Sequence, residues 1–374
     1  MTRADGAPLA LVMGDVDMVR ALGVAGIASA FFGPDDEPAR LSRHVRASVP
    51  WIDPWERQDE LVEALLRLAR TQPQPPLLFP QTDVTLLVAS RHRDRLAEGF
   101  RFALADAELV EGLVDKGRFQ ALAAEHRLPV PAAQRLRPAP GGPPPALEVP
   151  FPLVIKPLTR TPGWTALAGS SKALHVHDRG EYAAAWPALS ELSTELLAQQ
   201  LIAGPESRIE SFHVYVDASG AIAGSFTGRK IRTFPVDYGH STAVEVLPLP
   251  DVAALGRDVV GRLHLLEINP RFNLWHYPGA VAGVNLPALV YADLTGRERP
   301  PVAAEPREVA WVDPLQDLRA ARAWRVPPVA WLRFLAGCRA VCGLAWADPA
   351  PFLRGKLWGA VWRRTGGRAL RGAV

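Results

Sequence analysis

The chain is poor in cysteine and in long apolar runs. It has two cysteines among 374 residues, Cys338 and Cys342. Their spacing would place both on one face of a helix, which fits neither a disulfide framework nor a zinc site. No apolar run approaches the roughly 18 residues that a membrane-spanning helix needs, and the first residues lack the pattern of a secretory signal. We therefore expect a reduced, cytoplasmic protein without an integral membrane segment.

Lysine is also scarce. The net charge is only +3, and the basic residues are spread along most of the chain, so no nucleic-acid partner is indicated. Five of the 42 basic residues are lysines: Lys116, Lys156, Lys172, Lys230 and Lys356. Where such an arginine-rich chain keeps a lysine, a compact point charge is one explanation. For any single lysine, chance is an equally good one.

The first part of the sequence predicts an α/β domain over residues 1–108. Two short apolar runs, "LALVMGD" and "ASAFFGP", flank a segment with helical periodicity, which is the pattern of a parallel sheet. An amphipathic helix follows in "RQDELVEALLRLART", then a buried strand in "PPLLFPQTD". We expect Gln81 to Asp83, at the carboxyl end of that strand, to present ligand contacts. A dinucleotide site is not supported, because G-x-G-x-x-G is absent.

The middle part, residues 109–300, predicts a mixed α+β domain. A helix in "LVDKGRFQALAAEHRLPVP" precedes a proline-rich linker, "RPAPGGPPPALEVP". Strands are expected in "FPLVIKP", "ELLAQQLI" and "GRLHLLEINPRF", and a hairpin in "RIESFHVYVDASGAIAGSFTGRKIR" with "DASG" as its turn. The segment "LTRTPGWTALAGSSKALHV" predicts a Gly/Ser/Thr loop that leads into another strand.

The last part, residues 301–374, is rich in tryptophan and basic. The stretches "WLRFLAGCRAVCGLAW" and "PFLRGKLWGAVWRRTG" predict amphipathic helices. Packing on the body of the protein is the favoured interpretation. A peripheral membrane contact or a partner helix is the alternative.

One motif carries the clearest chemistry. In "HLLEINPRF", Glu267, Asn269 and Arg271 alternate, and alternate residues of a strand share one face. A carboxylate and an amide supply oxygen ligands for Mg²⁺, and an arginine can hold phosphate oxygens. Taken alone, the motif is also explained as the polar end of a strand.

The lysines strengthen the functional interpretation. Lys156 ends an apolar strand, where a lysine needs a partner such as a phosphate. The loop after it holds Gly163, Gly169, Ser170, Ser171 and Lys172, and such loops can bring backbone N–H groups onto phosphates. The P-loop pattern is absent. In this order, the features predict a magnesium–nucleotide site.

With these motifs in place, the chain resembles the ATP-grasp superfamily, in particular its carboligase-type, carbamoyl-phosphate-synthase-like members. The resemblance runs from Leu9 to Pro300 and is most specific in "LLEINPRF". It implies a Rossmann-like pre-ATP-grasp domain, a two-lobed ATP-grasp body and a C-terminal helical extension. It also implies an enzyme that activates a carboxylate as an acyl phosphate with Mg-ATP and joins it to an amine, forming a C–N bond.

The resemblance assigns roles to matching positions. It implies that Arg271 and Lys230, with Arg232 near them, lie on the substrate side as catalytic residues. It implies metal ligation by Glu267 and Asn269, with Mg²⁺ as the ion and Mn²⁺ as a second candidate. The implied ATP-binding residues are Lys116, Lys156, Lys172, Gln199, Gln200, Leu201, Ile202 and Glu206.

One part of the family pattern is missing. Members usually carry another acidic metal ligand on a strand just before the Glu-x-Asn strand, but here a helix predicted after Asp251 runs almost directly into Gly261. This indicates an internal deletion near residue 260. The candidates to replace the missing acidic metal ligand are Asp258 and Glu245. A catalytically impaired nucleotide-binding protein is therefore the alternative function.

The remaining expectations concern partners and acid–base groups. The partners are small-molecule carboxylate and amine substrates, and a homodimer is the candidate assembly. A biotin-carboxylase-like enzyme that uses bicarbonate is a third alternative. For four histidines, a structural role is favoured over a role as general base: His175, His177, His213 and His240.

Overall fold

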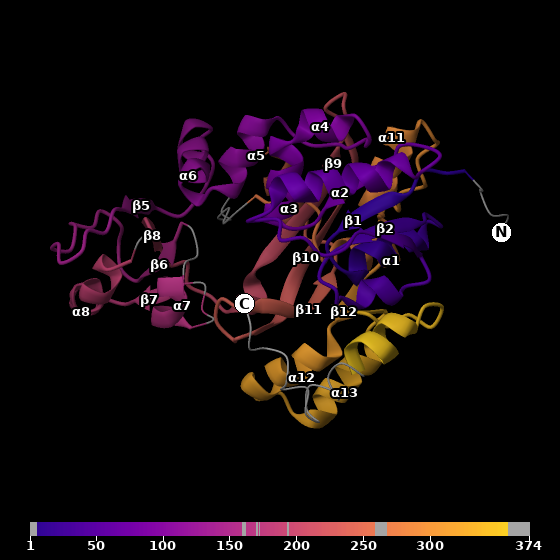
Figure 1. The fold of residues 1–374 in the computed structure, drawn as a ribbon. Coiled ribbons are helices and arrows are strands. Elements are labelled where there is room, and N and C mark those ends of the chain that lie inside the picture. The colour runs from indigo at the N-terminus through magenta and orange to yellow at the C-terminus, as the bar shows by residue number, and fades with distance from the viewer. Residues whose placement is uncertain are drawn as a thin grey trace, which may run out of the picture.

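The described residues fold around three β-sheets, which Figure 1 shows together with the helices that cover them. This computed structural model describes residues 6–158, 162–169, 171, 173–192, 194–258 and 268–357. Among the described residues, no helix is long and apolar enough to cross a membrane.

The first sheet is parallel, with the strand order β3–β2–β1–β4. Strands β1 and β4 are buried along their whole length because the sheet has helices on both faces, and the parallel α/β fold predicted for this part of the chain is confirmed. The strands are β1 (Ala10–Met13), β2 (Ser29–Phe32), β3 (Val45–Ser48) and β4 (Leu77–Pro80). The helices are α1 (Val16–Val24), η1 (Pro38–Leu41), α2 (Gln58–Arg70), α3 (Asp83–Arg91) and α4 (Arg93–Ala97).

The second sheet is antiparallel and carries the predicted strands "FPLVIKP" and "ELLAQQLI" side by side. Its order is β5–β8–β6–β7. The strands are β5 (Ala133–Leu136), β6 (Leu153–Pro157), β7 (Leu174–Val176) and β8 (Leu196–Gln200). The helices before and within this part are α5 (Ala107–Val114), α6 (Lys116–Glu125), α7 (Pro162–Ala168) and α8 (Arg179–Ser190).

Helix α7 corrects one prediction. The segment after Lys156 was expected to be a Gly/Ser/Thr loop, but residues 162–168 are helical. The reason is Trp164, which is fully buried in the core of this lobe and donates from its indole to the Ser171 carbonyl at 3.0 Å. The helix is followed by Gly169, whose φ of +60° suits glycine. Ser170 and Lys172 lie outside the described residues.

The third sheet has the order β13–β12–β11–β10–β9 and contains the predicted hairpin. Asp217 closes the turn, because its carboxylate accepts from Ser219 N at 2.9 Å and Ala221 N at 3.1 Å. The strands are β9 (Glu210–Val216), β10 (Ile222–Phe234), β11 (His240–Val246), β12 (Val309–Val312) and β13 (Ala340–Val341). The helices are η2 (Glu206–Arg208), α9 (Pro250–Asp258), α10 (His276–Ala282), α11 (Leu286–Thr295), α12 (Pro314–Ala323), α13 (Pro328–Gly337) and η3 (Pro351–Leu357).

The last part of the chain is not purely helical, which corrects the predicted helical extension. Strand β12 pairs with β11, and β13 pairs with β12, so this segment contributes two strands to the third sheet. Helix α13 ends at Gly337, and Cys342 follows β13. The two cysteines therefore do not share a helix face, contrary to the prediction from their spacing. Both are free thiols.

Two predicted features fall largely outside the described part of the chain. The strand "GRLHLLEINPRF" was expected from Gly261, but residues 259–267, and with them Glu267, are not described. The apparent deletion near residue 260 lies in the same stretch. The described residues 268–270 are in neither helix nor strand.

Candidate functional site

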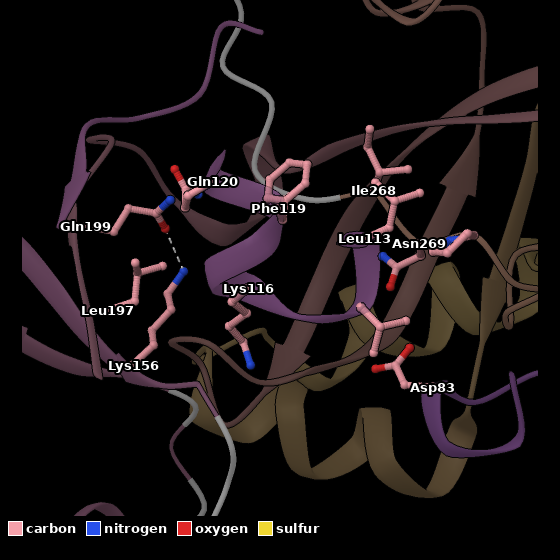
Figure 2. A pocket seen from close by; sticks show the side chains of 12 residues that line it. Asp83, Leu113, Lys116, Phe119, Gln120, Lys156, Leu197, Gln199, Ile268 and Asn269 are labelled. Carbon is pink, nitrogen blue, oxygen red and sulfur yellow. Dashed lines mark hydrogen bonds between the residues drawn. The ribbon is translucent and has the colours of Figure 1, made fainter. Parts of the chain in front are cut away.

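A cavity of about 120 Å³ lies where four parts of the chain meet. One wall comes from helices α5 and α6, and a second from strands β6 and β8. The third comes from the first residue of α3, and the fourth from residues 268–270. Figure 2 shows the lining side chains, which are Asp83, Leu113, Val114, Lys116, Phe119, Gln120, Lys156, Leu197, Gln199, Ile268, Asn269 and Pro270.

Lys156 and Gln199 line the part of the cavity that strands β6 and β8 form. The antiparallel pairing of β6 and β8 places Lys156 opposite Leu197, so that Gln199 is its diagonal neighbour. Lys156 Nζ donates to Gln199 Oε1 at 2.9 Å, as the dashed line in Figure 2 shows. Gln199 is 4% exposed and Lys156 is half-buried. The sheet thus holds an ammonium group at the cavity wall with its stem covered.

Lys116 stands at the first position of helix α6. The helix begins here because the Asp115 carboxylate accepts from Arg118 N at 2.8 Å and caps it. Lys116 Nζ donates to the Leu158 carbonyl at 3.3 Å, which brings the side chain toward the end of β6. The predicted pair Lys116 and Lys156 is therefore brought into one cavity from two different elements.

Two side chains with oxygen atoms suited to metal binding line another part of the cavity. Asp83 comes three residues after the end of β4 and opens helix α3, which is capped by the reciprocal hydrogen bonds of Thr82 and Thr85. Asn269 reaches the same cavity from residues 268–270. The predicted metal ligand Asn269 and the Asp83 carboxylate at the start of α3 therefore line the same cavity. Glu267, the predicted partner of Asn269, is outside the described residues.

Arg271 points to the N-terminal sheet rather than into the cavity. Its Nε donates to the Asp83 carboxylate, and its Nη1 donates to the carbonyls of Gln81 at 3.2 Å and Phe272 at 3.3 Å. Arg271 is not among the described residues that line the cavity. Its placement binds the loop that carries Asn269 to the end of β4.

Glu206 and Lys230 were predicted for different roles, and the structure brings them together. Lys230 Nζ lies 3.3 Å from Glu206 Oε2, and Tyr238 N donates to Glu206 Oε1 at 3.1 Å. Both side chains are mostly buried, with exposed fractions of 21% and 11%. Neither lines the described cavity. The same holds for Gln200, Leu201 and Ile202, which follow Gln199 along and beyond β8.

Arg232 is buried against the C-terminal helices, although the resemblance placed it on the substrate side. It makes two hydrogen bonds to the Asp317 carboxylate, at 2.9 and 2.6 Å. Asp317 also accepts from Thr242 at 2.8 Å and from the Trp331 indole at 2.9 Å. An irregularity in the pairing of β10 with β11 separates Lys230 from Arg232. Glu245, named as a substitute metal ligand, instead pairs with Arg229 at 2.5 Å.

The four histidines named from the sequence lie outside the lining of the described cavity. The ring centroids of His175 and His177 are 4.2 Å apart, outside the cavity lining, and His240 is exposed on β11. His213 stacks on Phe226 and also contacts the tilted ring of Trp275, and its neighbour is His276. Burial lowers the pKa of His213 well below its usual value and the pKa of His276 to about 3. Both imidazoles are therefore neutral at pH 7.

The sequence interpretation missed several residues of the cavity. Phe119 and Gln120 lie one turn along α6 from Lys116, so the helical period could have indicated them. Leu113 and Val114 end helix α5 against the same space. Asp83 was named only as part of a loop that presents ligand contacts. Its pairing with Arg271 joins residues far apart in sequence, and no local pattern signals that.

The comparisons with known proteins give a consistent fold. No protein-family model matches the chain. A curated relative, the D-aspartate ligase of Enterococcus faecium (strain Aus0004), is 24% identical over 232 residues. That match covers 59% of this chain and 55% of the relative, so the chain spans about half the length of the curated relative it matches.

Solved structures extend the likeness over most of the chain. An L-amino acid ligase from Bacillus licheniformis superposes with a TM-score of 0.55 at 15% identity, covering 79% of this chain and 75% of that one. A biotin carboxylase complex from Campylobacter jejuni gives a TM-score of 0.58 at 15% identity, covering 80% and 74%. The chain therefore shares the overall mixed α/β fold of these ATP-grasp ligases, as the resemblance implied, apart from the C-terminal extension corrected above.

Proposed function

We propose that this protein is an ATP-dependent ligase that activates a carboxylate as an acyl phosphate and joins it to an amine, forming a C–N bond. The observation that carries the proposal is the cavity, which collects Lys116 and Lys156 on one side and the oxygen donors Asp83 and Asn269 on another. The ligases among the relatives and solved structures support it.

The charged side chains that line the cavity suit the phosphates of a nucleotide. The matching biotin carboxylase structure is described as a beta-gamma-ATP complex, and we propose ATP as the nucleotide here. Lys116 and Lys156 would hold its phosphates, because ammonium groups bind phosphate oxygens through charge-assisted hydrogen bonds. Phe119 and Leu197 supply apolar surface in the same cavity for the base. Lys172, Gln200, Leu201, Ile202 and Glu206 keep the ATP-binding roles that the resemblance implies, as proposals.

The donor set fits magnesium. Mg²⁺ takes one or two carboxylates together with substrate phosphates, and Asn269 and Asp83 place an amide and a carboxylate at the cavity. Asn269, with Glu267 as the sequence implies, would hold the ion, which when bound neutralises phosphate charge. Mn²⁺ is the second candidate, because it shares the preference for oxygen ligands.

The chemistry of such a reaction depends on charge and position. The substrate carboxylate attacks the γ-phosphate, ADP leaves, and the amine then displaces phosphate from the acyl phosphate. These steps need positive charge and in-line placement more than a general base. Lys116 and Lys156 would supply the positive charge. Arg271 and Lys230 remain the residues proposed for the substrate side.

A second candidate function is nucleotide binding without turnover. Among the described residues that line the cavity, Asp83 is the one carboxylate, and it is already paired with Arg271. Across the described part of the chain, no group of three or more His, Cys, Asp or Glu side chains is placed to hold a metal ion. A site with so few carboxylates would bind Mg-ATP weakly.

Phosphate release separates the two functions. The full chain would be incubated with Mg-ATP and pools of D- and L-amino acids, then small carboxylic acids, since the relatives' names point to amino acids. A ligase releases phosphate only with certain pools, and Glu267→Ala and Lys156→Gln abolish the release. ATP binding without pool-dependent release would overturn the ligase proposal and support the second candidate. Bicarbonate with biotin tests the third alternative.

The homodimer and the cytoplasmic location expected from the sequence stay predictions. Size-exclusion chromatography with light scattering at several protein concentrations tests the first. The division into residues 1–108, 109–300 and 301–374 also stays a prediction, and limited proteolysis tests it.

A further inference from the structure

The end of the chain has an unusual charge balance. From Leu318 onward the sequence carries eleven basic residues and a single acid, Asp348. That acid does not reach the surface, since it is 3% exposed. Its carboxylate accepts from Ser42 Oγ at 2.6 Å and Arg43 N at 2.9 Å and lies 4.0 Å from Arg20. Asp348 thus joins the C-terminal segment to α1 and to the loop before β3, and it does not offset the positive charge at the surface.

The described arginines of this segment are exposed. Within the described part of the chain, none of the six arginines of residues 318–357 forms an ion pair with a carboxylate. Arginines elsewhere on the surface do pair: Arg95 contacts Asp59 and Glu63, and Arg299 contacts Asp217 and Asp293. The six are Arg319, Arg322, Arg325, Arg333, Arg339 and Arg354.

Helix α13 turns an apolar face outward beside these charges. No residue of this helix is fully buried. Its inner side is fixed by Trp331, which donates to Asp317 at 2.9 Å, and by Phe334, whose ring lies 4.3 Å from the Arg232 guanidinium carbon. Val329 and Leu332, three residues apart, are therefore on the outer side and are 60% and 56% exposed.

Two further large apolar side chains are exposed in the residues that follow α13. Trp346 is 94% exposed and Leu353 is 52% exposed. Figure 1 shows α12, α13 and the yellow residues after them along the lower side of the molecule, away from the cavity wall formed by β6 and β8. Side chains of this size and exposure on a folded protein mark an interaction surface.

We propose that residues 314–357 form a docking surface for an anionic lipid bilayer. Unpaired arginines beside an outward apolar helix face are the pattern of a helix that lies in a membrane interface. Exposed tryptophan suits the headgroup level, and the cations attract anionic headgroups. A nucleic acid would engage the arginines but not Val329, Leu332 or Leu353. The proposal is independent of the ligase proposal.

Vesicle sedimentation tests the surface on the full chain. We expect binding to vesicles of phosphatidylcholine with phosphatidylglycerol, weaker binding as salt rises, and none to phosphatidylcholine alone. Arg333→Gln with Arg339→Gln should lower the vesicle partition coefficient about fivefold per charge removed. Trp346→Ala should lower it without changing the salt dependence.

Matched controls are available on the N-terminal domain. Arg67→Gln with Arg70→Gln removes two exposed arginines of α2, and Trp55→Ala removes an indole that is 62% exposed. These variants should sediment like the original chain. The proposal fails if the anionic vesicles do not bind, or if the controls lose as much binding as the α13-side variants. It also fails if duplex DNA competes fully and Trp346→Ala has no effect. Thermal unfolding of every variant confirms that the exposed changes leave the fold intact.

Discussion

The Asp83 carboxylate accepts a hydrogen bond from Arg271 Nε, although the two residues are 188 positions apart. The pair joins the helix start after β4 to the loop that carries Asn269. Arg271 also donates to the Gln81 carbonyl at 3.2 Å, so the guanidinium holds this loop at two points of the N-terminal domain. The family resemblance assigned Arg271 to the substrate side. Its contacts here show a residue that also positions the cavity wall.

A double-mutant cycle measures this contact. Asp83→Asn and Arg271→Gln should each destabilise the fold, and their coupling should be about 1 kcal/mol, because the pair is partly exposed. Urea unfolding of the four chains gives the value. The local pair Arg57 and Glu60, whose arginine is much more exposed than Arg271, is the control and should couple by about 0.3 kcal/mol. A coupling near zero for Asp83 and Arg271 would contradict the structure.

Nucleotide binding tests the two lysines of the cavity. Lys156→Gln should weaken ATP binding about 10- to 100-fold, since a charge-assisted hydrogen bond contributes roughly 1.5–3 kcal/mol. Lys116→Gln should weaken it less, because that side chain is exposed. Isothermal titration calorimetry provides the affinities. Arg118→Gln, on the same helix but outside the cavity lining, should bind ATP like the original chain. Equal losses for all three variants would place the nucleotide elsewhere.

Removing Asp317 should destabilise the protein strongly. The pair with Arg232 is buried, and Asp317 also accepts from Thr242 and the Trp331 indole. Asp317→Ala leaves a buried guanidinium without a counter-charge, which costs about 3–5 kcal/mol. The free energy of unfolding in urea measures the loss. Asp59→Asn, at an exposed pair with Arg95, should change it by less than about 1 kcal/mol. A small effect of Asp317→Ala would mean that water reaches Arg232.

Stability should fall in mild acid because of His276 and His213. Folding lowers the pKa of His276 to about 3 and that of His213 well below 6.5, so the unfolded chain binds the protons more readily. Their stabilising contribution is therefore complete above about pH 6.5. It is lost as the pH falls below that value toward the folded-state pKa, by up to about 1.4 kcal/mol per pH unit for each histidine.

The control for this pH dependence is an exposed histidine. His276→Gln should flatten the fall of the unfolding free energy between pH 6.5 and 4.5, and His126→Gln should leave it unchanged, because His126 is exposed. Urea unfolding at steps of half a pH unit gives both curves. The same slope in the original chain and in His276→Gln would show that the imidazole is not protonated on unfolding.

Local patterns were sufficient for the elements that bury a regular face. The parallel sheet around β1, the amphipathic helix α2 and the hairpin of β9 and β10 follow from periodicity and turn residues alone. The same patterns failed where one anchored side chain overrides composition. Trp164 converts a Gly/Ser/Thr segment into helix α7, because burying its ring outweighs the low helix propensity around it.

For the candidate site, too, sequence and tertiary structure decided different things. The sequence by itself determined which residue types were available: Lys116 at a helix start, Lys156 on a buried strand, and Asn269 in "EINPRF". Only the tertiary structure decided which of them share a cavity, that Asp83 joins them, and that Lys230 turns to Glu206. It also buried Arg232 against Asp317 and exposed one face of α13. The reason is physical: periodicity reports the face of an element, whereas the partner of a charge is set by segments that pack together from distant parts of the chain.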